Sequence, residues 1–315
     1  MRKFIIFISS LLIFIVVALV FAADYFYGEA VKRGTEVELH KEEDAIPVMV
    51  DEENVKIIDT AVEWNAQQTY ETIELTSYDG LLLEGYFLEN ENKTGKAVIL
   101  AHGFRSDREG MEEYVQFYYD QGFDILIPDA RGHGESEGDY IGYGWHERLD
   151  IIQWSQMLID EKRSNKLLLH GVSMGASSVL MTSGEELPPE VMGIIADSGY
   201  TSAKGILTYQ LQHIYNLPSF PLIEITSGLT KVRSGFGFSE ASAVDQVTKN
   251  TLPLLLIHGE ADELVPASMA DEIYQAAGGE KTLWLVPDVG HVKAYTVATE
   301  EYQERLEGFI DETID

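Results

Sequence analysis

Eight short runs of aliphatic and β-branched residues recur along the chain after residue 70, and they constrain the fold more than any other feature. Stretches with helical spacing lie between the later runs. Continuous apolar strands that alternate with amphipathic helices predict a parallel sheet covered on both faces. The first two runs flank a turn at "YDG" and are expected to form an antiparallel hairpin at the sheet edge. The runs are "TIELTS", "LLLEGYFL", "KAVILAHG", "FDILIPDA", "KLLLHG", "VMGIIADS", "LPLLLIHG" and "KTLWLVPD".

The fifth run leads into "GVSMG", a serine held between two glycines. A tight strand-to-helix turn of this pattern forces Ser173 into strained backbone angles and presents its hydroxyl at the top of the sheet. Gly171 and Gly175 are expected to be required there, because a Cβ at either position would clash across the turn. A serine that only caps a helix would need neither glycine. The pattern therefore predicts a nucleophilic serine.

A serine hydroxyl is a weak nucleophile until a base accepts its proton. "LLLIHGEADELVP" ends one later strand and offers Asp262, and "LWLVPDVGHVKAY" ends the next and offers His291. The order serine, acid, histidine is the one expected when all three follow strands of such a sheet. Asp262 is preferred because its distance past the strand leaves a loop able to reach the histidine.

Other carboxylates compete for the role of the acid. Asp197 also follows a strand, in "IIADSGY", and is kept as the reserve. Three more lie close enough to the last two strands to be confused with the true acid: Glu260, Glu263 and Asp288.

Acyl transfer also requires donors for the oxyanion that forms on the substrate carbonyl. The amide of Met174, directly after the serine, is expected to supply one. The loop after the third run, "AHGFRSDREG", is expected to supply the other from Phe104, because Gly103 gives the preceding turn its freedom. The glycine-rich "DARGHGESEG" lacks the phosphate-binding pattern and is expected to be a structural loop at the rim of the site.

Charge and cysteine content exclude several classes of function. The chain has 53 acidic and 22 basic residues, a formal net charge of −31, which argues against nucleic acid as a partner. Without cysteine it has no disulfide, no thiolate metal site and no cysteine nucleophile. The remaining histidines lack a spacing with acidic residues that suggests a metal site, so neither a metal nor a cofactor is expected.

The N-terminus carries an apolar segment, residues 4–22, with no charged side chain. Its length suits a helix that crosses a bilayer, and Arg2 and Lys3 before it should stay in the cytoplasm. Residues 1–23 are therefore expected to be a single-pass anchor that places the rest of the chain outside. The alternative is a cleaved signal peptide and a secreted protein, since Val20 and Ala22 suit a cleavage site.

Two further regions differ from the strand–helix rhythm. Residues 24–66 carry 12 acidic and 4 basic side chains and are interpreted as an acidic spacer that ends in a helix around residues 60–73. Residues 67–315 then form the main domain. Within it, residues from about 200 to 250 show no clear strand–helix unit and are expected to be a helical cap over the carboxyl edge of the sheet, with most of their aromatic side chains packing the cap itself.

From about residue 70 onward the sequence resembles the α/β-hydrolase superfamily. The matching segments are "HGF", "DARGHGESEG", "GVSMG", "HGEADELVP" and "GHVKAY". The additional segments "YGWHERLDI" and "DSGYTS" are similar to those of bacterial membrane-anchored or cell-surface serine hydrolases, which are related to esterases and acyl-peptidases. The resemblance implies the α/β-hydrolase fold, a triad of Ser173, Asp262 and His291, and oxyanion donors at Phe104 and Met174.

These observations predict a serine hydrolase on the outer face of a membrane that cleaves carboxylic esters through an acyl-enzyme. An ester is favoured because an alcohol leaves more easily than an amine. A peptidase or amidase acting on short peptides is the alternative enzyme. A surface-binding protein on an inactive hydrolase scaffold is the alternative from another class, although a scaffold would not need the serine, acid, histidine and both glycines. A dehalogenase would need a carboxylate in place of Ser173.

Overall fold

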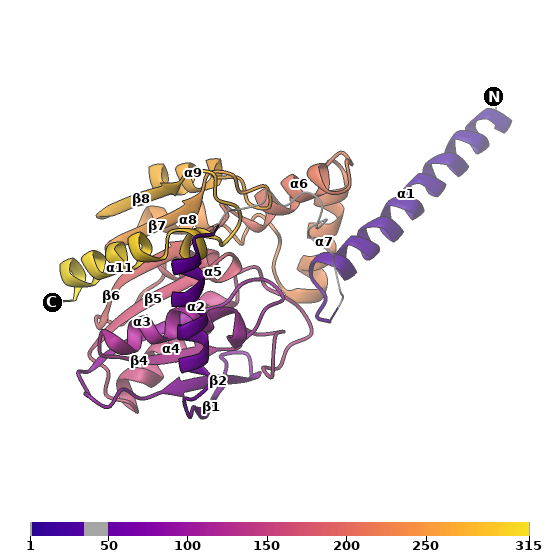
Figure 1. Ribbon diagram of the computed structural model, residues 1–315. Coiled ribbons are helices and arrows are strands. Elements are labelled where there is room, and N and C mark those ends of the chain that lie inside the picture. The colour runs from indigo at the N-terminus through magenta and orange to yellow at the C-terminus, as the bar shows by residue number, and fades with distance from the viewer. Residues whose placement is uncertain (1, 35–49, 315) are drawn as a thin grey trace.

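A computed structural model describes residues 2–34 and 50–314, and its centre is a sheet in the order β1-β2-β4-β3-β5-β6-β7-β8 (Figure 1). Each of the eight predicted runs forms one strand. The strands are β1 (Glu71–Thr76), β2 (Leu82–Leu88), β3 (Lys96–Ala101), β4 (Phe123–Pro128), β5 (Lys166–Val172), β6 (Val191–Asp197), β7 (Leu254–Gly259) and β8 (Lys281–Val286).

The sheet is mostly parallel, as predicted. From β4 onward, in the spatial order of the sheet, all neighbours are parallel. The predicted hairpin is confirmed, because β1 lies at the edge and pairs antiparallel with β2, which pairs antiparallel with β4. The fold is therefore the α/β-hydrolase fold that the sequence predicted.

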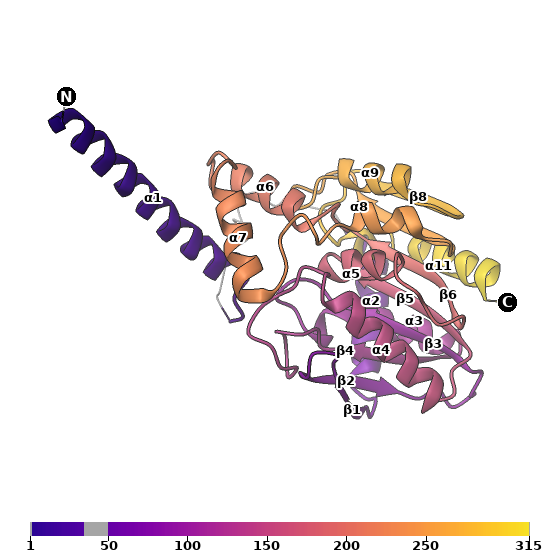
Figure 2. The same ribbon diagram turned by 180° about the vertical axis from the view of Figure 1, so that it is seen from behind.

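Helices cover both faces of the sheet (Figures 1 and 2). The helices within the described residues are α1 (Arg2–Ala30), which projects away from the sheet, α2 (Glu52–Asn65), α3 (Glu112–Asp120), α4 (Glu147–Asp160), α5 (Met174–Thr182), α6 (Ala203–His213), α7 (Leu222–Ser234), α8 (Ala243–Gln246), α9 (Ser268–Ala276), α10 (Ala294–Val297) and α11 (Thr299–Thr313), with 3-10 helices η2 (Arg108–Met111) and η3 (Val247–Lys249).

Two hydrophobic cores result from this arrangement, one on each face. Successive residues of a strand point to opposite faces. In β3, Ile99 joins the core under α4, α5 and α9, whereas Val98 and Leu100 join the core under α3 and α11. An apolar side chain is needed at each buried position after Lys96, which explains why the sequence of this strand shows no polar alternation.

The N-terminal helix extends further than the sequence predicted. α1 is long and apolar enough to cross a membrane, with a mean hydropathy of 3.2 in its most apolar window, and none of that window is buried in the protein. The helix continues past residue 22 to Ala30, and its last turns lie beside α7 (Figures 1 and 2). Ala23 and Val31 are buried in the core.

The described parts of the expected spacer therefore pack against the domain, the end of α1 on α7 and α2 on α3. A helix is present near its end, but α2 occupies Glu52–Asn65 rather than residues 60–73. It starts there because the carboxylate of Asp51 accepts a hydrogen bond from the amide of Glu53 at 3.1 Å. α2 packs on α3, with the rings of Trp64 and Tyr119 4.9 Å apart. Residues 35–49 of the expected spacer lie outside the described residues.

The interval from residue 200 to 250 holds α6, α7, α8 and η3 and no strand. Phe236 and Phe238 are fully buried, as expected for aromatic residues that pack a core. Tyr215 and Phe220 differ from that expectation because they are exposed. α6 and α7 lie at one end of the sheet, on the side from which α1 projects (Figure 2).

Candidate active site

Ser173 occupies the turn between β5 and α5, with φ 53° and ψ −114°. The two flanking glycines leave room for that turn. A Cβ on Gly171 would lie 2.3 Å from the backbone of Gly175, and one on Gly175 would lie 1.9 Å from the carbonyl oxygen of Ala101. Both distances are too short for any residue with a Cβ. The backbone geometry of the turn therefore requires glycine at both positions, as the sequence pattern predicts.

The structure brings Ser173, His291 and Asp262 together. His291 Nε2 lies 2.8 Å from the hydroxyl oxygen of Ser173, and His291 Nδ1 lies 2.7 Å from Oδ2 of Asp262. The carboxylate can only accept a hydrogen bond, so a neutral imidazole carries its proton on Nδ1. The lone pair on Nε2 is then directed at the serine hydroxyl, as proton abstraction requires.

The surroundings of Asp262 keep its carboxylate ionised. Burial alone would raise its pKa, but hydrogen bonds from His258 and His291 outweigh that effect and lower the pKa to about 2. The other carboxylate oxygen accepts the amides of Leu264 and Val265 at 2.9 and 2.8 Å. The acid is thus fixed in position and charged at neutral pH.

His258 also contacts this site. From its place directly after an apolar run and before Gly259, the sequence predicts only that it packs and hydrogen-bonds the turn. Its Nε2 lies 2.8 Å from the carbonyl oxygen of Val265 and 3.2 Å from Oδ2 of Asp262. A proton on Nε2 can serve both acceptors, so the second histidine donates to the same carboxylate oxygen as His291. The spacing of four residues between His258 and Asp262 is the sequence signal for this contact. The imidazole reaches the carboxylate, however, only because of the way the turn between them folds.

The competing carboxylates lie elsewhere. The residues Glu260, Glu263 and Asp288 are exposed. Asp197 is fully buried, accepts hydrogen bonds from Ser198 Oγ at 2.8 Å and Tyr302 at 3.0 Å, and has a pKa raised by burial. Its connection to the histidine is indirect, because Ser198 Oγ accepts the amide of Val292, next to His291, at 3.2 Å.

A buried polar chain continues behind Asp197. Its neighbour Tyr302, on α11, lies 3.3 Å from Nε2 of His170 on β5, and Tyr118 on α3 lies 2.9 Å from Nδ1 of the same histidine. Burial lowers the pKa of His170 to about 3, so this histidine is neutral at physiological pH.

The two expected oxyanion donors lie next to the serine. Met174 begins α5 directly after Ser173, and the loop that carries Phe104 passes close by, since a Cβ on Gly103 would lie 3.4 Å from Cβ of Ser173. Within the described residues, the hydrogen bonds of loops, caps and side chains include none from the amide of Phe104 or Met174. Both donors are therefore available to a substrate, and their role remains a prediction.

Buried ion pairs and hydrogen bonds hold the rim loop "DARGHGESEG" in place. Arg131 is buried and forms ion pairs with Asp150 at 2.7 Å and Asp79 at 2.9 Å. Asp129 accepts the amides of Arg108 and Glu135 at 3.2 and 2.9 Å. These contacts agree with the expected structural role of the loop.

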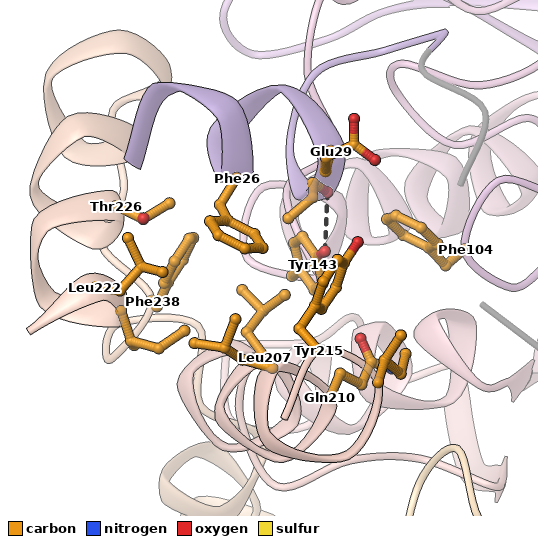
Figure 3. Close-up of a pocket in the computed structure, with 14 residues that line it drawn as sticks. Phe26, Glu29, Phe104, Tyr143, Leu207, Gln210, Tyr215, Leu222, Thr226 and Phe238 are labelled. Atoms are coloured by element: carbon orange, nitrogen blue, oxygen red, sulfur yellow. Dashed lines mark hydrogen bonds between the residues drawn. The ribbon is translucent and has the colours of Figure 1, made fainter. Parts of the chain in front are cut away.

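A largely apolar pocket adjoins this site on the side of the cap (Figure 3). About 580 Å³ in and around it is free of protein atoms, a volume that includes open solvent, and Phe104 forms one end of it. Ser173, Asp262 and His291 are not among its lining residues. The pocket therefore begins one loop away from the reacting hydroxyl.

Comparisons with known proteins agree with this architecture. Residues 92–214 match the family described as serine aminopeptidase, S33. The uncharacterized protein YqkD of Bacillus subtilis is 28% identical over 78% of this chain and 82% of its own length. The esterase Pf2001 of Pyrococcus furiosus superposes with a TM-score of 0.66 at 25% identity, covering 80% of this chain and 94% of that one. An acylaminoacyl peptidase of Pyrococcus horikoshii shares the fold, with a TM-score of 0.61 at 14% identity over 79% of this chain and 43% of that one.

Proposed function

Because the chain belongs to the α/β-hydrolase superfamily, we propose that it is a serine hydrolase that cleaves carboxylic esters through an acyl-enzyme on Ser173. The observation that carries the proposal is the continuous pair of hydrogen bonds from Ser173 through His291 to Asp262, 2.8 and 2.7 Å long. Nucleophile, base and orienting acid are each within reach of the next, as acyl transfer requires.

The reaction proceeds in two halves. His291 Nε2 removes the hydroxyl proton while Ser173 Oγ attacks the carbonyl carbon, and the carbonyl electron pair becomes an oxyanion that the amides of Met174 and Phe104 bind. Collapse of this intermediate breaks the ester bond, and His291 returns the proton to the departing alcohol. Water, activated by the same imidazole, then attacks the acyl-enzyme and releases the carboxylic acid. Asp262 holds the imidazole in its reactive tautomer throughout.

An ester is preferred to a peptide for two reasons. An alcohol is a better leaving group than an amine, and the adjoining pocket is lined mainly by aliphatic and aromatic side chains. An aminopeptidase would need a charged partner for the substrate's amino group. Among the described residues that line the pocket, Glu29 is the only charged one, and its carboxylate points away from the cavity (Figure 3).

A fluorophosphonate probe and a panel of chromogenic esters and aminoacyl anilides test the proposal. The wild type should be labelled and should hydrolyse esters faster than anilides, whereas Ser173→Ala should remain unlabelled and lose on the order of 10⁶-fold in kcat. Ser268→Ala, which removes an exposed hydroxyl, is the control and should behave like the wild type. An unlabelled wild type that hydrolyses nothing would favour the inactive scaffold, and faster anilide cleavage would favour the peptidase.

We also infer that α1 anchors the protein as a single span with the hydrolase domain outside the cytoplasm. The support is the exposed, uncharged surface of residues 4–22 and the positive charge of Arg2 and Lys3 at the end expected to stay inside.

A further inference from the structure

The apolar pocket beside Ser173 is built partly from the end of the N-terminal helix. Phe26 and Ala30 of α1 form one wall, Leu207 of α6 and Leu222 of α7 form others, and Phe104 closes one end (Figure 3). A pocket lined mainly by aliphatic and aromatic side chains suits a flexible hydrocarbon group better than a polar ligand.

Hydrogen bonds fix the end of α1 to the loops around the site. Arg105, next to Phe104, donates to the carbonyl oxygen of Glu29 at 2.6 Å, and the hydroxyl of Tyr143 donates to that of Ala30 at 2.8 Å. The wall from α1 and the expected oxyanion loop are thus held together, so a chain in the pocket would lead toward Ser173.

Exposed apolar side chains occur in the segment between α6 and α7, which contacts the end of α1 through Tyr215. Four of them occur within seven residues of the cap, between α6 and α7: Ile214, Tyr215, Leu217 and Phe220. Phe220 is 73% exposed, and the ring of Tyr215 lies 5.2 Å from that of Phe26 on α1. Aromatic and aliphatic side chains in this position are typical of the membrane–water interface. The pocket and the base of α1 therefore lie at the same end of the molecule.

We propose that this pocket binds the acyl chain of an ester resident in the membrane, and that the end of α1 is one of its walls. The inference rests on the proposed esterase function and adds the class of substrate. The acyl chain leaves the bilayer beside α1, passes between α6 and α7 into the pocket, and brings its carbonyl carbon to Ser173.

One polar group in the pocket provides a sharp test. Thr226 of α7 lines the cavity, is 2% exposed, and its hydroxyl has no hydrogen-bond partner within the described residues. A hydrocarbon chain beside that hydroxyl cannot satisfy it. Thr226→Val removes the hydroxyl at nearly constant volume and should therefore improve binding of a long chain.

The first experiment uses the full chain in nanodiscs and nitrophenyl esters from acetate to octanoate. For the wild type, kcat/KM should rise about fourfold for each methylene that enters the pocket. Thr226→Val should raise the octanoate-to-acetate ratio at least threefold. Leu207→Trp, which fills the cavity, should lower that ratio at least tenfold. Val232→Trp, at an exposed position of α7, is the matched control and should leave the ratio unchanged.

The second experiment locates the source of the substrate. A fluorogenic long-chain ester is placed either in the same vesicles as the enzyme or in separate vesicles, and hydrolysis should be at least tenfold faster in the shared bilayer. Leu217→Gln in the cap should reduce that advantage, whereas Leu82→Gln in β2 should not. The two leucines are 40% and 42% exposed, so they form a matched pair.

The outcomes separate this proposal from the proposed function. If the wild type is labelled by fluorophosphonate but all variants have the same octanoate-to-acetate ratio, the esterase function is supported and the assignment of the pocket to the acyl chain is wrong. Equal rates from shared and separate vesicles would overturn delivery from the bilayer. Absence of labelling in the wild type would instead overturn the esterase itself.

Discussion

The backbone of Ser173 lies in a conformation that residues with a Cβ rarely adopt. Its φ of 53° and ψ of −114° are imposed by the turn from β5 into α5, and the amide of Ser173 is held by the carbonyl oxygen of Asp197 at 2.8 Å. A residue in such a region costs roughly 1–3 kcal/mol, which the surrounding structure must outweigh. The strain directs the hydroxyl toward His291.

Ser173→Gly should relieve that strain. Glycine adopts the conformation freely, although the added freedom of the unfolded chain offsets about 0.4–1 kcal/mol of the gain. The free energy of unfolding should therefore exceed that of Ser173→Ala by about 1 kcal/mol. Urea unfolding of the full chain in detergent micelles measures the difference. The alanine variant is the control because it lacks the hydroxyl but keeps the Cβ, and equal stabilities would contradict the strain.

At this scale the sequence indicated which three side chains come together but not the groups that hold them in place. Ser173, Asp262 and His291 could be found because each follows an apolar run that ends at the same sheet edge. The second donor to Asp262 was missed, because His258 reaches the carboxylate only when the turn after β7 folds back on itself. Asp197 is the reserve acid because it also follows a strand, and only the fold shows that it bonds to Tyr302.

Hydrogen bonds through the buried imidazole of His170 link β5 to α3 and α11, and through α11 to β6. Tyr118 of α3 and Tyr302 of α11 contact its two nitrogens, and Tyr302 also bonds to Asp197 of β6. The pKa of His170 is lowered from 6.5 to about 3 by burial. Its contribution to stability is therefore fully present above pH 6.5 and is lost as the pH falls toward 3.

His170→Gln should flatten the dependence of stability on pH. Between pH 4 and 6 the unfolded wild type binds about one more proton at this position than the folded protein, so the slopes should differ by about 1.4 kcal/mol per pH unit. Urea unfolding at several pH values measures both slopes. Glu113 and Asp197, whose pKa values burial raises, act in the opposite sense in both proteins. Parallel curves would show that His170 does not titrate in this way.

The strands could be predicted from sequence more readily than the helix ends. All eight apolar runs form strands because a parallel sheet needs apolar residues on both faces, which is a local pattern. The extension of α1 to Ala30 could not be foreseen in the same way, because Ala23 and Val31 are buried only by contacts with segments far along the chain. Lys32, for example, forms an isolated antiparallel β-bridge with Tyr140.

The molecule as a whole consists of a hydrolase domain with a protruding apolar helix that is firmly attached at its base. Arg33 donates to the carbonyl oxygens of Gly134 and Ser136, both at 2.6 Å, and Tyr27 shares a hydrogen bond with Ser234 on α7 at 3.0 Å. The domain is therefore held at a defined orientation to α1, and to the bilayer if α1 spans it.

Protease added to intact cells should digest the hydrolase domain, while the untreated protein sediments with membranes and resists extraction at alkaline pH. The reason is that a single apolar span with positive charge before it leaves the following domain outside. A cytoplasmic protein of the same cells is the control and should survive the protease. Recovery of a soluble protein that begins near Ala23 would show that the segment is removed as a signal.

The attachment of residues 23–33 has a consequence for processing of the chain. A cut directly after Ala22 would remove the bilayer span, yet Phe26, Ala30 and Arg33 would keep their contacts with the domain. Release from the membrane would then change the location of the enzyme, while the residues of α1 that line the pocket would stay in place. Tethered and released forms could share one chemistry and differ only in which lipids they meet.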